Sequence, residues 1–210
     1  MYIADQNAVL DQGRAPARRA FVVDGDRAAK VINAAIIDDG LERMYGSEDP
    51  EANEDIFYYV TVYNQPHVMP PRPDHVTPAD IVAGLYKMTD APERPVSATL
   101  VFSGPAHLAA TEAAEELADR WGVGVDLWSA TSYKRLREEA IETERHNRLH
   151  PHEDRSEPLV ARLLSDGEGP VVAVTDFMKA VPDQIARWVP RPFHVLGTDG
   201  FGRSDTREAP

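Results

Sequence analysis

Three histidines in the second half of the chain have a spacing that could bind a metal ion. His146 and His150 are four residues apart, and His152 follows closely. On a helix, two imidazoles with this spacing lie on one face and can share one zinc ion. Pro151 ends that helix, however, and no carboxylate motif such as His-Glu-x-x-His accompanies the pair. The pattern therefore favours a solvated or hydrogen-bonded helix end, and we predict no metal site.

A glycine-rich stretch near the C-terminus follows a predicted strand and could cradle an anion. It reads Leu196-Gly197-Thr198-Asp199-Gly200-Phe201-Gly202-Arg203-Ser204. It does not match the GxGxxG motif, and the sequence contains no P-loop GxxxxGK[ST]. An ordinary strand-end turn is the favoured interpretation, and phosphate binding is the alternative. Gly200 and Gly202 would permit tight or positive-φ backbone there. Asp199 could pair with Arg203 across the turn.

The composition excludes several classes of protein. The 210 residues include 22 basic and 35 acidic side chains, a net charge of −13. Such a surface repels phosphate backbones, so we expect no nucleic-acid partner. Because cysteine is absent, disulfides and thiolate metal sites are excluded. No apolar run approaches the roughly 20 residues of a membrane span, and the N-terminus lacks the apolar centre of a secretory signal. We therefore expect a cytoplasmic protein without a membrane partner.

The first third of the chain contains one predicted helix and one predicted strand. Apolar residues recur near a 3.6-residue period over 28–44, which predicts a helix. Residues 56–63 are dense in β-branched and aromatic side chains and predict a buried strand. Five prolines in residues 64–80 indicate a linker and a domain boundary, and His67 lies within it.

Beyond the linker, strands and helices alternate. The predicted strands are 81–88, 97–103, 123–128, 171–175 and 193–196, and the predicted helices are 106–121, 136–148, 158–164 and 177–188. Alternation of this kind with continuous apolar strands indicates an α/β fold with a mostly parallel sheet covered on both faces. The mixed charges of 134–157 favour a solvated helix face, with a docking surface as the alternative.

Seven stretches between about residues 36 and 208 keep the order and spacing of one known family. They are 39–46, 54–61, 64–73, 84–87, 144–151 (Glu-Arg-His-Asn-Arg-Leu-His-Pro), 175–179 (Thr-Asp-Phe-Met-Lys) and 196–205. Together they resemble the homodimeric type of pyruvate dehydrogenase first component, in the transketolase superfamily. The resemblance assigns 36–63 to the end of a pyrimidine-binding domain, 64–80 to the linker and 81–210 to a C-terminal domain cut short at its end. Residues 1–35 remain unassigned.

The resemblance implies both a fold and a reaction. The expected fold is a three-layer α/β/α domain with a five-stranded mixed sheet whose first strand is antiparallel, preceded by a helix–strand remnant. The implied reaction is oxidative decarboxylation of pyruvate, dependent on thiamine diphosphate and magnesium, with acetyl transfer to lipoyl groups. The implied partners are upstream thiamine-binding domains or a homodimer partner, and the dihydrolipoyl acetyltransferase component of the complex.

The sequence departs from that family where the cofactor binds. The diphosphate motif, Gly-Asp-Gly with a later Asn-Asn, is absent, and Asp24-Gly25-Asp26 is a poor imitation. The domain that carries the activating glutamate is missing apart from its last helix and strand. We therefore expect a fragment or remnant that has no catalytic residue and binds no cofactor alone. A non-catalytic assembly or regulatory module is the alternative, and an unrelated small-molecule-binding α/β protein is a third possibility.

Two further expectations concern particular segments. Some family members carry a histidine directly before Met-Pro in the linker, where this chain has Val68, so His67 is only a candidate for the substrate channel. The signature residues Asp199, Gly200, Phe201, Gly202, Arg203 and Ser204 are expected to have a structural or interface role. We also expect residues 28–63 to pack poorly on the C-terminal domain and to promote self-association, because an orphan strand leaves open edges.

Overall fold

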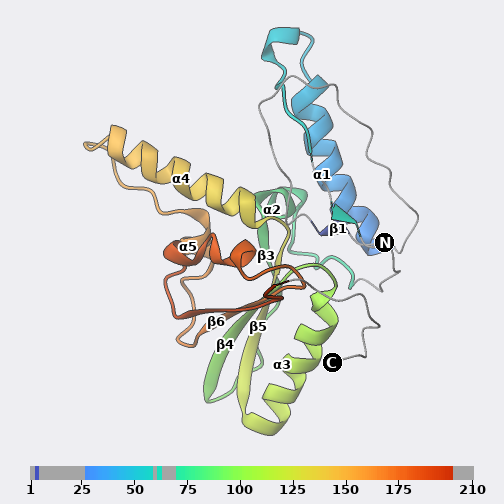
Figure 1. The fold of residues 1–210 in the computed structure, drawn as a ribbon, viewed down its shortest axis with the longest axis vertical. Coiled ribbons are helices and arrows are strands. Elements are labelled where there is room, and N and C mark those ends of the chain that lie inside the picture. Colours follow the sequence, from blue (N-terminus) through green and yellow to red (C-terminus); the bar gives the residue numbers. More distant parts are fainter. Residues whose placement is uncertain (1–2, 5–26, 59–60, 63–69, 201–210) are drawn as a thin grey trace.

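The structure is a computed structural model, and it describes residues 3–4, 27–58, 61–62 and 70–200 (Figure 1). The main sheet has five strands: β3 (Leu85–Thr89), β4 (Val96–Phe102), β5 (Val123–Ala130), β6 (Val171–Val174) and β7 (Phe193–Leu196). Their order is β3-β5-β4-β6-β7, with β3 antiparallel to β5 and the remaining neighbours parallel. The prediction of a five-stranded, mixed, mostly parallel sheet is confirmed.

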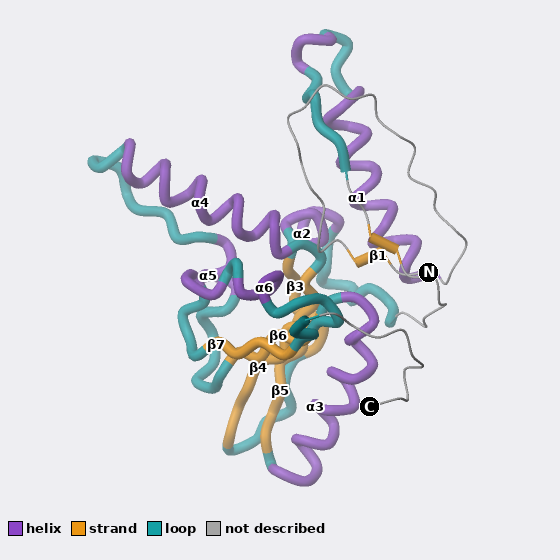
Figure 2. Tube along the Cα trace, in the orientation of Figure 1, coloured by secondary structure: helices purple, strands orange, loops and turns teal. Residues whose placement is uncertain are grey.

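Helices cover both faces of this sheet (Figure 2). One face is covered by α3 (His107–Trp121), which follows the short 3₁₀ helix η2 (Gly104–Ala106). The other face is covered by α4 (Tyr133–Leu149), α5 (Leu159–Leu163), α6 (Ala180–Asp183) and the 3₁₀ helix η3 (Ala186–Trp188). The result is the three-layer α/β/α arrangement that the resemblance implied.

Alternating side chains of the central strands fill two separate cores. On β4, Val101 packs toward α4, α5 and η3, whereas Leu100 and Phe102 pack toward α3. This alternation follows from the two-residue period of a strand. The α4 side holds the side chains with 0% exposure, including Tyr133 and Leu136, so it forms the more deeply buried core.

The segment before the first sheet strand forms a helix where we predicted a strand over 81–88. The helix is α2 (Pro78–Ala83), and β3 begins only at Leu85. Thr77 and Asp80 cap each other reciprocally, Pro78 occupies the first turn, and Gly84 ends the helix in left-handed conformation at φ 106°. These local signals are strong helix boundaries, and they outweigh the apolar run that suggested a strand.

Two other predicted elements were wrong in extent. The single helix predicted over 177–188 is divided into α6, which contains Pro182 in its first turn, and the 3₁₀ helix η3. Of the strand predicted over 56–63, residues 56–58 do not form a strand, and β2 (Thr61–Val62) pairs antiparallel with β1 (Ile3–Ala4). The first predicted helix is confirmed as α1 (Arg27–Tyr45).

The segment that we expected to pack poorly makes a buried contact with the C-terminal domain. Ala35 and Ile36 of α1 form a cluster with Val76, Ile81 and Tyr86, and all five side chains are at most 9% exposed. The contact forms because α2, the unexpected helix, presents Ile81 to α1. Among the described residues, no helix is long and apolar enough to cross a lipid bilayer.

Candidate functional site

The turn after β7 packs against the loop after β6, so two of the family-like stretches meet. The Thr198 amide donates to the Phe177 carbonyl at 2.9 Å, and the Thr198 hydroxyl lies 3.4 Å from the Asp176 carbonyl. A Cβ on Gly197 would lie 2.7 Å from the Phe177 oxygen, so this close approach requires glycine. The stretches 175–179 and 196–200 therefore form one structural feature.

The charged residue of this turn has a different partner from the one we considered. The carboxylate of Asp199 lies 2.8 Å from Nζ of Lys179, and this hydrogen bond raises the pKa of the lysine. Gly200 has φ 89°, which confirms the expected positive-φ backbone. Phe201, Gly202, Arg203 and Ser204 lie outside the described residues, and so does His67. The proposed pairing with Arg203 and the substrate-channel role of His67 stay predictions.

The carboxyl ends of the parallel strands meet beside this turn. Strand β4 lies between β5 and β6, so the chain reverses its direction of travel across the sheet at the β4/β6 boundary. Ligands of open α/β sheets bind outside the strand ends at such a point. Here the position is filled by the chain itself: Ser103 is 0% exposed and Thr175 is 5% exposed. The Ser103 amide donates to the Val174 carbonyl at 3.2 Å, which closes the boundary.

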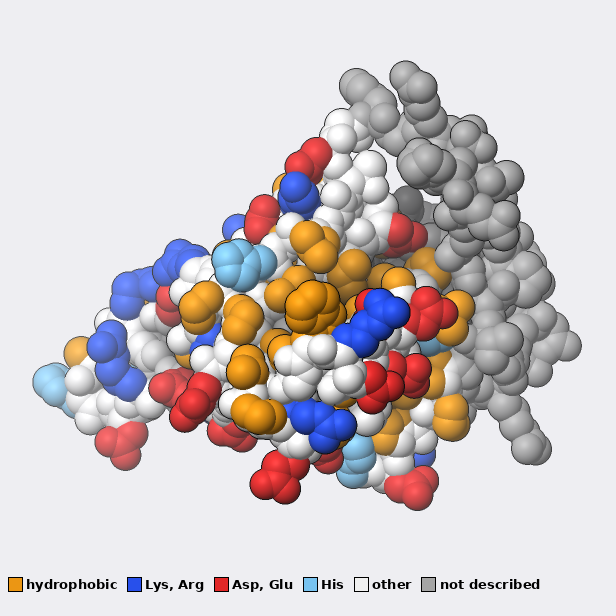
Figure 3. All heavy atoms as spheres, turned by 90° about the horizontal axis from the view of Figure 1, so that it is seen from below, with side chains coloured by type: hydrophobic (Ala, Val, Ile, Leu, Met, Phe, Trp, Pro, Cys, Tyr) orange, Lys and Arg blue, Asp and Glu red, His pale blue; other side chains and the backbone are white. Residues whose placement is uncertain are grey.

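An open cleft lies instead between α1 and α2, beside the first turn of α4. It has a volume of ≈ 830 Å³. Its charged lining consists of Asp38, Asp39 and Glu42 of α1, with Arg72 and Arg135 opposite. On the face drawn in Figure 3, acidic and basic side chains are likewise interspersed, and they do not form one continuous basic area.

A polar network fixes one wall of the cleft. The Tyr58 hydroxyl donates to Asp39 at 2.7 Å, and Arg43 binds Tyr58 and Glu54. Burial and the Asp39 hydrogen bond raise the pKa of Tyr58 to about 12, so its hydroxyl stays a donor at neutral pH. The hydrogen bond from Arg43 lowers the pKa of Glu54, which keeps that carboxylate charged. The wall thus carries a network of ionised and hydroxyl groups that link α1 to residues 54 and 58.

The described residues do not fit a thiamine diphosphate group. The cleft has room for it, but a diphosphate there would meet the carboxylates Asp38, Asp39 and Glu42 as well as Arg72 and Arg135, so three of the five charged lining residues repel it. Like charges at close range are unfavourable, and the cleft offers no glycine-rich anion cradle among its lining residues. We therefore derive no chemical step there.

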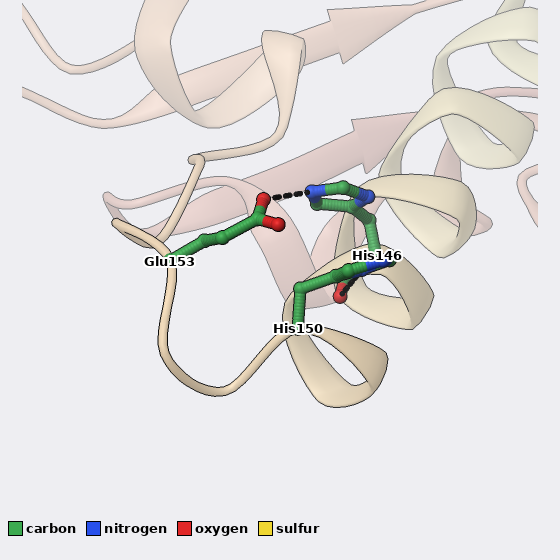
Figure 4. A group of neighbouring side chains, drawn as sticks. All are labelled: His146, His150 and Glu153. Carbon is green, nitrogen blue, oxygen red and sulfur yellow. Dashed lines mark hydrogen bonds and ion pairs between the residues drawn. The ribbon is translucent and has the colours of Figure 1, made fainter.

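The histidine pair lies at the C-terminal end of α4. The carboxylate of Glu153, which the sequence pattern did not predict, lies beside it. His146 Nε2 is 3.1 Å from Glu153 Oε2, and the His146 and His150 rings stack with centroids 4.2 Å apart (Figure 4). His152, the third histidine of the predicted cluster, does not belong to this group. Glu153 was missed because it follows Pro151, outside any helical spacing.

The fold and the two family-like stretches define a class, an α/β/α domain whose five-stranded sheet has one antiparallel edge strand. Residues 84–209 match the transketolase-like TK C-terminal domain family. This match covers more than half of the chain, which therefore belongs to that family.

The chain is similar to three bacterial proteins that are each named pyruvate dehydrogenase E1 component. The protein from Mycolicibacterium smegmatis is 44% identical over 207 residues, and that from Mycobacterium tuberculosis is 43% identical over 207 residues. Each of these alignments covers 98% of this chain and 21% of the relative. The Escherichia coli K12 protein is 42% identical over 176 residues, 83% of this chain and 19% of its own length. The chain thus spans about a fifth of the length of the relatives it matches.

Proposed function

We propose that the chain supplies the C-terminal domain of a pyruvate dehydrogenase first component and acts only within a larger cytoplasmic assembly. In that assembly, pyruvate is oxidatively decarboxylated with thiamine diphosphate and magnesium, and the acetyl unit passes to lipoyl groups. The observation that carries the proposal is similarity over 98% of this chain to 21% of such a protein.

The structure supports a positioning role for the chain. The cleft between α1 and α2 is open, and its charges, Asp38, Asp39 and Glu42 against Arg72 and Arg135, suit contact with a polar protein surface. The same cleft does not suit a diphosphate. We infer that upstream thiamine-binding domains, or those of a homodimer partner, hold the cofactor, and that the acetyltransferase component receives the product.

A regulatory or assembly module without catalysis is the second candidate. It is favoured by the acidic lining of the cleft, because the described residues offer no cradle for the cofactor. The two candidates differ in whether the domain restores activity to the part of the enzyme that holds the cofactor.

A chimaera separates them. The Mycolicibacterium smegmatis relative would be cut before its region of similarity and joined to this chain, and decarboxylation of pyruvate would be measured with thiamine diphosphate and magnesium. We expect activity in the chimaera and none in the truncated relative or in this chain alone. A folded but inactive chimaera would favour the regulatory module, and turnover by this chain alone would refute both candidates.

A further inference from the structure

The C-terminal end of α4 holds three potential metal ligands that the reaction proposed above does not use. The helix points away from the sheet, and its second half is exposed (Figure 1). His146 and His150 lie one turn apart at its end, and Glu153 lies on the loop that follows. One nitrogen or oxygen from each side chain lies within 4.8 Å of the other two.

The loop places Glu153 by contacts on both sides of it. The Asn147 side chain donates to the Ser156 carbonyl at 2.8 Å and accepts from the Ser156 amide at 3.0 Å. The Leu159 amide donates to Glu139 of α4 at 2.8 Å, and the Glu153 amide donates to the His150 carbonyl at 3.1 Å. These bonds hold the backbone of the loop along the helix. They place Glu153 where its carboxylate can contact His146.

The hydrogen bond of the His150 ring leaves its second nitrogen free to bind a metal ion once the ring rotates. His150 Nδ1 lies 3.0 Å from the His146 carbonyl, so Nδ1 carries the proton and Nε2 keeps its lone pair. Metal-binding histidines are commonly oriented by this kind of bond to a carbonyl. His146 Nε2 and Glu153 Oε2 are 3.1 Å apart, within hydrogen-bond distance. Two ligands of a tetrahedral zinc ion, with bonds of about 2.0–2.2 Å, are separated by nearly the same distance.

We propose that His146, His150 and Glu153 bind a divalent transition-metal ion of the zinc class, with water at an open fourth position. The ion replaces the hydrogen bond between His146 and Glu153, and a rotation of the exposed His150 ring brings Nε2 to it. The two imidazoles favour zinc, nickel and copper over magnesium and calcium, which prefer sites made of oxygen ligands alone. The carboxyl end of a 17-residue helix adds an attractive field for a cation.

Binding would fasten the loop to α4 and hold the tip of this exposed helix in one conformation. An ion that binds only the folded state stabilises it according to the ratio of ion concentration to dissociation constant. The site does not depend on the proposed enzymatic role, because none of its ligands lies near the cleft or the turn after β7.

The test is calorimetric titration of zinc chloride into the full chain without an affinity tag, in a buffer that does not chelate zinc. We expect one ion per chain with micromolar affinity. His146→Ala, His150→Ala and Glu153→Gln should each weaken binding at least tenfold. His152→Ala, which removes a neighbouring exposed histidine outside the cluster, should change the affinity less than twofold.

A second readout uses cobalt, because tetrahedral cobalt(II) absorbs visible light far more strongly than hydrated cobalt(II). Wild-type chain and His152→Ala should both give this absorption, and His146→Ala should not. Circular dichroism of each variant confirms that the chain is folded. Absence of binding to wild-type chain, equal loss in His152→Ala, or unchanged affinity in any of the three ligand variants would overturn the proposal.

Discussion

The sheet with its covering helices and the α1 segment are held in place by different kinds of contact. In the sheet region, Val101, Tyr133 and Leu136 are 0% exposed and belong to one continuous apolar core. Among the α1 side chains whose burial the structure describes, Ala35 and Ile36 are the hydrophobic ones that are buried, and polar bonds at partly exposed positions add to their contact.

This difference predicts that the sheet region and the α1 segment of the same chain differ in stability. Burial of large apolar side chains contributes about 1.5–3 kcal/mol per residue, whereas partly exposed ion pairs contribute roughly 0–1 kcal/mol. The sheet region should therefore unfold as one cooperative body. The α1 segment should open at lower free energy than the sheet region.

The largest expected effect comes from the deep core. Leu136→Ala should lower the free energy of unfolding by about 3 kcal/mol, because the side chain leaves a cavity in a region with little room to relax. Urea denaturation followed by circular dichroism measures the change. Leu149→Ala on the same helix, where the side chain is 63% exposed, is the matched control and should have little effect. Equal losses for the two variants would contradict the assigned core.

A local effect should follow from the α1 contact. Ile36→Ala removes a side chain that is 4% exposed, and it should favour opening of α1 by about 2 kcal/mol while changing global unfolding less. Hydrogen exchange of α1 amides, read by mass spectrometry, resolves this opening. Leu41→Ala, on the same helix and 49% exposed, is its control. If Ile36→Ala and Leu136→Ala lower the global stability equally, the two regions form one cooperative body.

Within the turn after β7, glycine should matter more than charge. Gly200→Val places a β-branched residue at φ 89°, which should cost about 1.5 kcal/mol. Among the described residues, Asp199→Ala breaks the exposed pair with Lys179, so it should leave the melting temperature unchanged within error. Thermal unfolding of both variants is the measurement. A larger loss for Asp199→Ala would mean that the charge, and not the backbone, holds this turn.

The smallest effect concerns the cap of α2 and depends on pH. Hydrogen bonds from Thr77 lower the pKa of Asp80 in the folded chain, so its contribution is present above the unfolded pKa. That contribution is lost as the pH falls through the folded pKa. Asp80→Ala should cost about 1 kcal/mol at neutral pH, and the difference from wild type should shrink between about pH 5 and pH 2. Denaturation curves across this range check it, and a difference that grows toward low pH would have the wrong sign.

Elements with strong local signals were predictable from the sequence, and tertiary contacts were not. The strand at 193–196 and the stop at Gly122 follow from apolar runs and a glycine in left-handed conformation. The capping box of α2, Thr77 with Asp80, was also present in the sequence, but the proline-rich surroundings favoured a linker. The capping box predicts the start of this helix better than the proline content does.

The candidate sites needed information that no local pattern contains. Glu153 reaches His146 because Asn147 binds Ser156 across nine residues. Asp199 pairs with Lys179, 20 residues earlier, because two loops meet at the same edge of the sheet. The sequence could identify the stretches that matter, but only the packed sheet brings them together.

Thiamine diphosphate binding is the most direct test that this chain is the part of the enzyme without the cofactor site. Calorimetry with the purified chain, thiamine diphosphate and magnesium should give no heat of binding at micromolar concentrations. The acidic lining of the cleft, Asp38, Asp39 and Glu42, is the physical reason. Saturable binding of the cofactor with micromolar affinity would contradict the account.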